Sequence, residues 1–75
     1  MATTTLDAKG LNCPLPIMKA KKSLKGLTSG DVLEVLSTDP GSVKDFESFC
    51  KATGHSLLET DEQGEGNYRF LIEKK

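Results

Sequence analysis

The chain has 75 residues, of which 36% are hydrophobic and 28% charged, and its formal net charge is −1. This length and composition indicate one small folded domain and exclude a disordered chain, and no apolar run is long enough to span a membrane. The near-neutral charge argues against direct binding of nucleic acid, because nucleic-acid-binding domains carry a marked basic excess.

The hydrophobic pattern predicts six elements in the order βαβαββ, starting with a short strand at residues 4–8. A helix is expected next, from Pro14 or Pro16 to Leu27. Its apolar side chains recur at spacings of three and four, which is the stripe of an amphipathic helix: Ile17, Ala20, Leu24 and Leu27. Residues 31–37 are β-branched and apolar, and they predict a buried strand.

A second helix is expected after the turn TDPGS, with Asp39 as its N-cap, Pro40 in its first position and Gly54 at its C-terminal end. Residues 55–61 and 67–73 indicate two strands that are joined by the hairpin loop EQGEG. Two helices with one apolar face each, together with four strands, predict an α+β two-layer sandwich. Both helices should cover one face of a mixed four-stranded sheet.

The segment GLNCPLPI places Cys13 directly before Pro14, with Pro16 two residues further on. A residue before proline is extended, as an N-cap residue is, so Cys13 is expected beside the opening of the first helix. Leu15 also precedes a proline, which leaves the first helical turn at either Pro14 or Pro16. The free N–H groups and the dipole of a helix start favour a thiolate. We therefore expect Cys13 to be a presented, activated thiol rather than a buried and inert one.

No recognisable motif pairs an acid or a base with Cys13, and the single histidine, His55, is distant in the chain and is expected at a strand edge or cap. A domain this small has no room for an enclosed substrate cavity. An activated thiol without its own catalytic residues suggests a group that other proteins load and unload, with a persulfide sulfur as cargo. The cysteines lack zinc-ligand spacing, and no metal or other cofactor is expected.

The second cysteine, Cys50, falls within the apolar arc of the second helix, between Phe46 and Thr53, and is predicted to be a core residue. If Cys50 instead resolved an oxidised Cys13, the protein would be a dithiol redox factor. The first residues lack a signal-peptide pattern, so a cytoplasmic location is expected, and a structural disulfide is not expected in that reducing compartment.

The amino-terminal third of the chain is rich in lysine, whereas most of the acids follow it. Met18 departs from the apolar stripe of the first helix and should be exposed. With Leu15, Lys19 and Lys22 it forms a candidate docking surface for a partner that has an apolar and acidic patch. The alternative is a solvated lysine face that tolerates a methionine. A non-enzymatic regulatory module that uses this lysine-rich helix is a further functional alternative.

The segment LDAKGLNCPLPIMKAKK resembles the amino-terminal signature of the TusA/SirA/YedF-like sulfur carriers, with a strand ending in Asp-Ala, then Gly-Leu, then the CPxP motif. STDPGSVKDFESFCKATGH is similar to the second-helix segment of that family, and YRFLIEK is similar to its last strand. The resemblance implies a βαβαββ sandwich and a cytoplasmic sulfurtransferase without independent turnover. It also implies that Cys13, the cysteine of the motif, accepts sulfur as a persulfide.

In proteins of this kind the sulfur comes from a cysteine desulfurase or a rhodanese-like protein and passes to a DsrE/TusD-like acceptor. One branch serves 2-thiouridine formation in transfer RNA, and another serves sulfur-compound oxidation, in which the cargo can be a thiosulfonate. The variable position of the motif is Leu15 here, where some relatives carry an acid. An apolar residue at this position is expected to change the choice of partner, and the two branches stay open.

Overall fold

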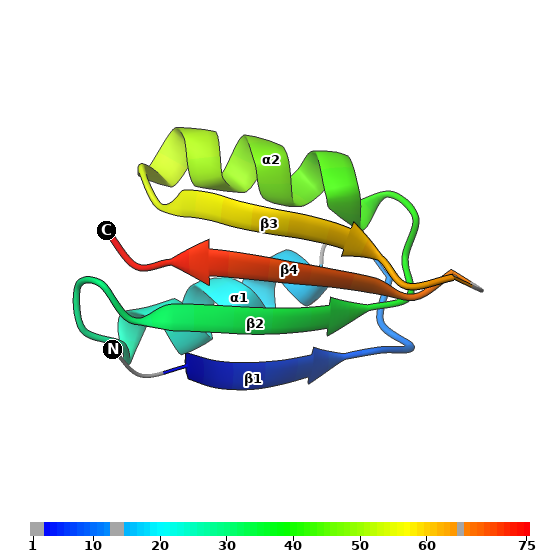
Figure 1. Cartoon of the computed structure of the whole chain (residues 1–75), viewed down its shortest axis with the longest axis horizontal. Coiled ribbons are helices and arrows are strands. Elements are labelled where there is room, and N and C mark those ends of the chain that lie inside the picture. The colour runs from blue at the N-terminus through cyan, green and yellow to red at the C-terminus, as the bar shows by residue number, and fades with distance from the viewer. Residues whose placement is uncertain (1–2, 13–14, 65) are drawn as a thin grey trace.

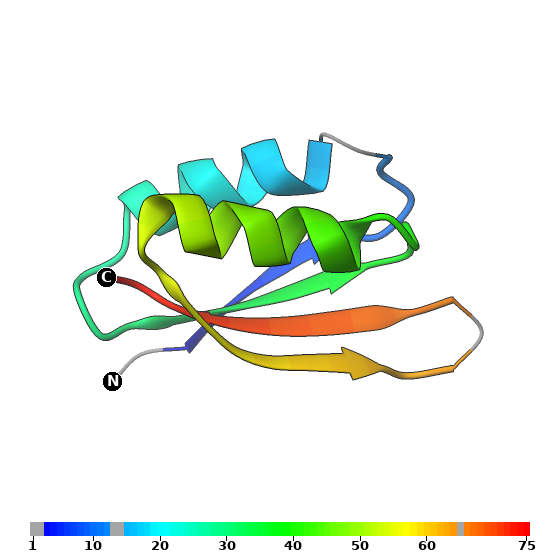
Figure 2. The same cartoon turned by 90° about the horizontal axis from the view of Figure 1, so that it is seen from above.

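Four strands form one sheet, and two helices cover one of its faces (Figures 1 and 2). The computed structural model describes residues 3–12, 15–64 and 66–75. The elements in chain order are β1 (Thr3–Ala8), α1 (Leu15–Lys25), β2 (Val32–Ser37), α2 (Ser42–Thr53), β3 (Ser56–Glu62) and β4 (Tyr68–Glu73). The α+β two-layer sandwich predicted from the sequence is confirmed.

The strand order in the sheet is β1-β2-β4-β3, so the last strand of the chain lies between β2 and β3. β1 and β2 are parallel, as a crossover through α1 requires, and β4 is antiparallel to both of its neighbours. The two central strands carry most of the buried strand residues, because the helices cover them on one face and strands flank them on both sides. This position accounts for the apolar character of residues 32–36, in which Glu34 is the one polar residue.

The core lies between the helices and the sheet. Phe46 of α2 packs on Phe70 of β4 with 4.7 Å between the ring centroids, and neither side chain is exposed to solvent. The predicted apolar stripe of α1 faces the same core. The buried cluster consists of Ala8, Ala20, Leu24, Leu33, Val35, Phe46, Cys50, Phe70 and Ile72. The helical periodicity seen in the sequence therefore identified the correct faces of both helices.

The start of α2 differs from the prediction. Gly41 is the N-cap and the helix begins at Ser42, so Asp39 is not the cap and Pro40 precedes the helix. Asp39 instead forms the preceding turn, in which its Oδ1 accepts the Gly41 N–H at 3.0 Å and its carbonyl accepts the Ser42 N–H at 3.0 Å. The other end of α2 agrees with the prediction, because Gly54 ends it with a φ of +84°.

The strand register defines two ends of the sheet. Ala8, Ser37, Tyr68 and Glu62 share one end, which we call the hairpin end because the β3–β4 connection turns there. Both helices start at this end (Figure 1). The segment that leads to Cys13 leaves β1 at the hairpin end, so the surroundings of this segment are where a functional site is sought.

Candidate functional site

The segment between β1 and α1 begins with a turn held by local hydrogen bonds. The Lys9 N–H donates to Asp7 Oδ1 at 3.0 Å, and the Leu11 N–H donates to the Ala8 carbonyl at 3.3 Å. Gly10 has a φ of +81°, a conformation that favours glycine because a side chain would add strain. Glycine at this position therefore allows the chain to turn sharply away from the sheet.

A further hydrogen bond joins this segment to the turn between β2 and α2. The Gly10 N–H donates to Thr38 Oγ1 at 2.9 Å, across 28 positions of the chain. Ser37, the residue before Thr38, is fully buried at the end of β2, and its Oγ accepts the Asp39 N–H at 3.2 Å. The β2–α2 turn is thus attached to the sheet on one side and hydrogen-bonded within itself.

Within the described residues the first helix begins at Leu15, between the two prolines predicted as its start. The Leu15 N–H donates to the Asn12 carbonyl at 2.9 Å. A residue before proline is biased away from helical backbone angles but is not barred from them, so Leu15 can be helical. Pro16 has no N–H to donate, and at this position in the first turn a helical N–H would have no partner within the helix. Pro16 is buried against the core, so it supports the helix start by packing. Cys13 and Pro14, both predicted site residues, lie outside the described residues.

The predicted docking surface is exposed along α1. Leu15 is 45% exposed and Met18 59%, and both are large apolar side chains in contact with solvent. Lys19 and Lys22 are also exposed, and neither forms an ion pair with any residue that the structure describes. The first turn of α1 contains no acid. These side chains therefore combine apolar area with unpaired positive charge, a combination that suits an acidic partner surface with an apolar centre.

Cys50 lies in the core, with 4% of its surface exposed. Burial raises the pKa of its thiol, so little thiolate forms at neutral pH. A thiol without access and without ionisation is a poor resolving group for a disulfide. The prediction that Cys50 is a core residue is confirmed.

His55 lies directly before β3, whose first residue, Ser56, pairs with Glu73 at the end of the sheet opposite the hairpin end. Its Nδ1 accepts the Lys75 N–H at 3.0 Å. The imidazole is therefore engaged with the backbone, at the far end of the sheet from the segment that leads to Cys13. This placement agrees with the strand-edge role predicted for His55 and not with that of a catalytic base.

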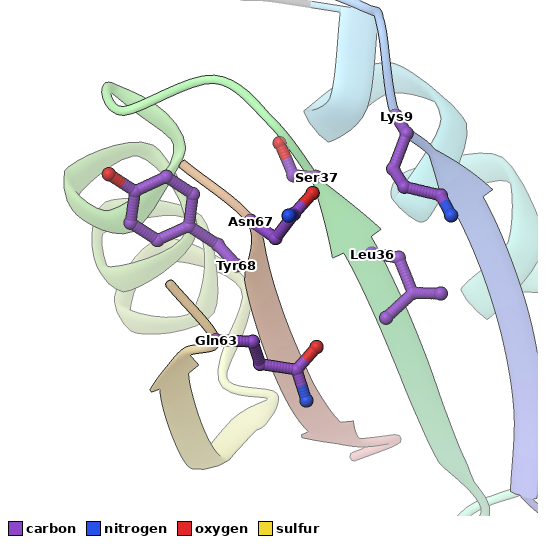
Figure 3. Close-up of a pocket in the computed structure, with 6 residues that line it drawn as sticks. All are labelled: Lys9, Leu36, Ser37, Gln63, Asn67 and Tyr68. Atoms are coloured by element: carbon purple, nitrogen blue, oxygen red, sulfur yellow. The ribbon is translucent and has the colours of Figure 1, made fainter. Parts of the chain in front are cut away.

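The hairpin end also carries an open hollow of about 250 Å³ (Figure 3). Its lining is polar except for Leu36, which lies between β1 and β4 in the view: Lys9, Leu36, Ser37, Gln63, Asn67 and Tyr68. Within the described part of the chain, the Lys9 ammonium forms no ion pair. A hollow of this size holds a few water molecules or one side chain of a partner.

Sequence reasoning missed the residues around this hollow and the role of Thr38. Lys9, Asn67 and Thr38 are ordinary turn residues in the sequence, and no local pattern joins them. Their proximity follows from the pairing of β1 with β2 and of β2 with β4, which brings three separate turns to one end of the sheet.

The described residues include no group of three or more His, Cys, Asp or Glu side chains that could hold a metal ion. In the same ranges, none of the helices has the length and apolar character needed to cross a bilayer.

Comparisons with known proteins agree with the fold and extend over nearly the whole chain. Residues 4–74 match the family model described as Sulfurtransferase TusA. The chain is 61% identical to the sulfur carrier protein TusA of Allochromatium vinosum, over 92% of this chain and 90% of that protein. It is 46% identical to the sulfur carrier protein TusA of Pseudomonas entomophila, over 95% and 88% of the two chains.

Among solved structures, a SirA-like protein from Desulfitobacterium hafniense superposes with a TM-score of 0.83 at 31% sequence identity. The match covers 93% of this chain and 95% of that one. Sequence and structure thus agree over nearly the whole length of both proteins, and the chain belongs to the TusA family of sulfurtransferases.

Proposed function

We propose that this protein is a sulfur carrier that accepts sulfur on Cys13 and passes it to another protein. The observation that carries the proposal is the family match over residues 4–74, a range that includes the whole CPxP motif. The relatives from Allochromatium vinosum and Pseudomonas entomophila are both named as sulfur carriers.

In the proposed reaction, the Cys13 thiolate attacks the terminal sulfur of a donor persulfide. The new bond forms between the two sulfurs, the sulfur–sulfur bond of the donor breaks, and the donor leaves as a thiolate. Cys13 is then a persulfide, and the proton balance is met by exchange with water. In the second step an acceptor thiolate attacks the terminal sulfur of Cys13 in the same way. No net oxidation occurs, so neither step needs an external electron carrier.

The described geometry supports a carrier rather than an enzyme with independent turnover. His55 lies at the opposite end of the sheet, and the side chains near the hairpin end include no histidine. The donor and acceptor proteins would supply the acid and base groups, and we propose a cysteine desulfurase or rhodanese-like donor and a DsrE/TusD-like acceptor. The surface of Leu15, Met18, Lys19 and Lys22 is the proposed contact with these partners, and Pro14 and Pro16 are proposed to support the motif.

The test of this function is the loading of sulfur. Incubation with a cysteine desulfurase and cysteine should add the mass of one sulfur atom to the intact protein, and a thiol reductant should remove it. Cys13→Ser should abolish the addition, and Cys50→Ala is the matched control that should retain it. Equal loading of the Cys13→Ser protein would rule out the assignment.

The dithiol redox alternative is disfavoured by the buried position of Cys50. A regulatory module without sulfur chemistry is the other alternative. In that case Cys13→Ala would leave the cellular phenotype of the protein intact, whereas reversal of the lysine charges on α1 would remove it. Two alternatives stay open: the pathway is either transfer RNA thiolation or sulfur oxidation, and the cargo is either a persulfide or a thiosulfonate. The cytoplasmic location stays a prediction.

A further inference from the structure

The chain between Ala8 and Leu15 must leave the sheet at a definite angle if Cys13 is to meet the start of α1 in a constant position. Four residues of this segment are described, Lys9 to Asn12. Most hydrogen bonds shown for them join residues two or three positions apart, so these bonds shape the turn without attaching it to the rest of the molecule.

The bond from the Gly10 N–H to Thr38 Oγ1 is different, because it reaches another turn of the fold. Among the described residues it is the one hydrogen bond between the Lys9–Asn12 segment and a distant part of the chain. Gly10 is also the residue with positive φ in this segment, so the bond acts at the point where the chain changes direction.

Thr38 lies in a turn that is attached to the rest of the fold on both sides. Ser37 before it is paired with Ala8 on one side and Tyr68 on the other. Asp39 after it accepts hydrogen bonds from Ser42, through both the backbone N–H and the side-chain hydroxyl. The oxygen of Thr38 therefore belongs to a turn that is held at both ends. The segment at Gly10 is otherwise held by short-range hydrogen bonds and by the packing of Leu11 against the core.

We propose that Thr38 is a positioning residue for Cys13: its Oγ1 holds Gly10 and thereby sets the path by which the chain reaches the start of α1. The inference rests on the proposed role of Cys13 as the sulfur-accepting thiol. Cys13 is three positions after Gly10, a span of at most about 11 Å, so a displacement at Gly10 is transmitted over a short distance. Thr38 does not touch the sulfur and takes no part in the chemical step.

The test uses the intrinsic reactivity of Cys13 toward iodoacetamide, with no sulfur donor present. The rate is measured against pH, and peptide mass spectrometry separates Cys13 from Cys50. Thr38→Val removes the acceptor oxygen and keeps the shape of the side chain. It should lower the alkylation rate at neutral pH by about two- to tenfold, in line with the loss of one ordinary hydrogen bond, and move the midpoint of the profile to higher pH. Thr38→Ser keeps the oxygen and should restore the wild-type profile.

Thr5→Val is the matched control, because Thr5 Oγ1 also makes a 2.9 Å hydrogen bond, to Glu34, but on β1 and away from the segment. It should leave the profile of Cys13 unchanged. A profile of Thr38→Val that superposes on the wild type, or a Thr38→Ser protein that behaves like Thr38→Val, overturns the proposal.

Hydrogen exchange gives a second test that needs no variant. The Gly10 amide of the wild type should exchange severalfold more slowly than an unprotected amide of the same sequence, and exchange at the unprotected rate contradicts the proposal even if Thr38→Val fails to fold. Failure of sulfur loading with a normal iodoacetamide profile would count against the proposed function and leave the positioning role of Thr38 intact.

Discussion

Arg69 of β4 forms an ion pair with Glu34 of β2 on the face of the sheet opposite the helices, with its Nε donating to a carboxylate oxygen of Glu34. Glu34 also accepts a hydrogen bond from Thr5 Oγ1 at 2.9 Å, and Arg69 Nη1 reaches Glu59 Oε2 at 3.4 Å. One row of side chains therefore joins all four strands. The hydrogen bonds from Arg69 and Thr5 lower the pKa of Glu34.

Replacing Glu34 with glutamine is expected to lower the free energy of unfolding by no more than about 1 kcal/mol at neutral pH, because the pair is partly exposed and screened by solvent. The pKa of Glu34 is lower in the folded protein than in the unfolded chain, so its contribution is present above the ordinary value of 4.5 and is lost as the pH falls through the folded value. Urea unfolding of the wild type and of Glu34→Gln at pH 7 and at pH 3 measures the loss of unfolding free energy and its dependence on pH. A difference between wild type and Glu34→Gln that is equally large at pH 3 would contradict this origin of the stabilisation.

His55 is expected to make the stability of the folded protein depend on pH as well. Burial lowers its pKa, and repulsion from Lys74 and Lys75 adds to the effect. Because the folded protein favours the neutral imidazole, this contribution to stability is present above the ordinary value of 6.5 and decreases as the pH falls below it. His55→Asn keeps a side-chain acceptor for the Lys75 N–H but does not titrate. The thermal midpoint of the wild type should fall more between pH 7 and pH 5 than that of His55→Asn, and parallel curves would exclude His55 as the source.

The two cysteines are expected to differ sharply in their reactivity toward thiol reagents. In the native protein Cys50 should stay unmodified under conditions that label Cys13, because burial both blocks access and raises the pKa of the Cys50 thiol. Urea should make Cys50 reactive. Peptide mass spectrometry after a short labelling pulse measures the two sites separately. Rapid labelling of Cys50 in the native state, together with loss of sulfur loading in Cys50→Ala, would favour the redox alternative.

Reversal of charge on α1 should slow sulfur loading if the lysines guide the partner. Lys19→Glu combined with Lys22→Glu is expected to reduce the second-order rate of loading about tenfold at low salt, and the difference should shrink as salt rises. Lys44→Glu combined with Lys51→Glu makes the same change in net charge on the exposed face of α2 and is the matched control. Equal effects of the two double variants would show that net charge matters and that the α1 surface does not.

Much of the fold could be predicted because the required information is local. Helical spacing identified Ala20 and Leu24 as core residues and left Met18 exposed, and the structure agrees on each. Local rules failed at Asp39, where the preference of aspartate for an N-cap competes with its preference for a turn. Asp39 has the side chain of an N-cap, but it forms the turn before the helix, since its carboxylate bonds the Gly41 N–H and leaves the cap position to Gly41.

The candidate site was predictable only in part. The helix start, the exposed α1 surface and the motif itself could be identified from neighbouring residues. The bond between Gly10 and Thr38 could not, because two residues that are 28 positions apart meet only after β1 pairs with β2. The hollow that includes Lys9 and Asn67 depends in addition on the pairing of β2 with β4.

The sequence by itself determined the six elements, their buried faces, the burial of Cys50 and the exposure of Met18, since each of these depends on periodicity within one element. The tertiary structure alone decided that β4 lies between β2 and β3, that Arg69 lies between Glu34 and Glu59, and that Thr38 Oγ1 accepts the Gly10 N–H. These contacts join residues far apart in the chain, and their partners are selected by strand pairing and by packing of the whole core, which no local pattern encodes.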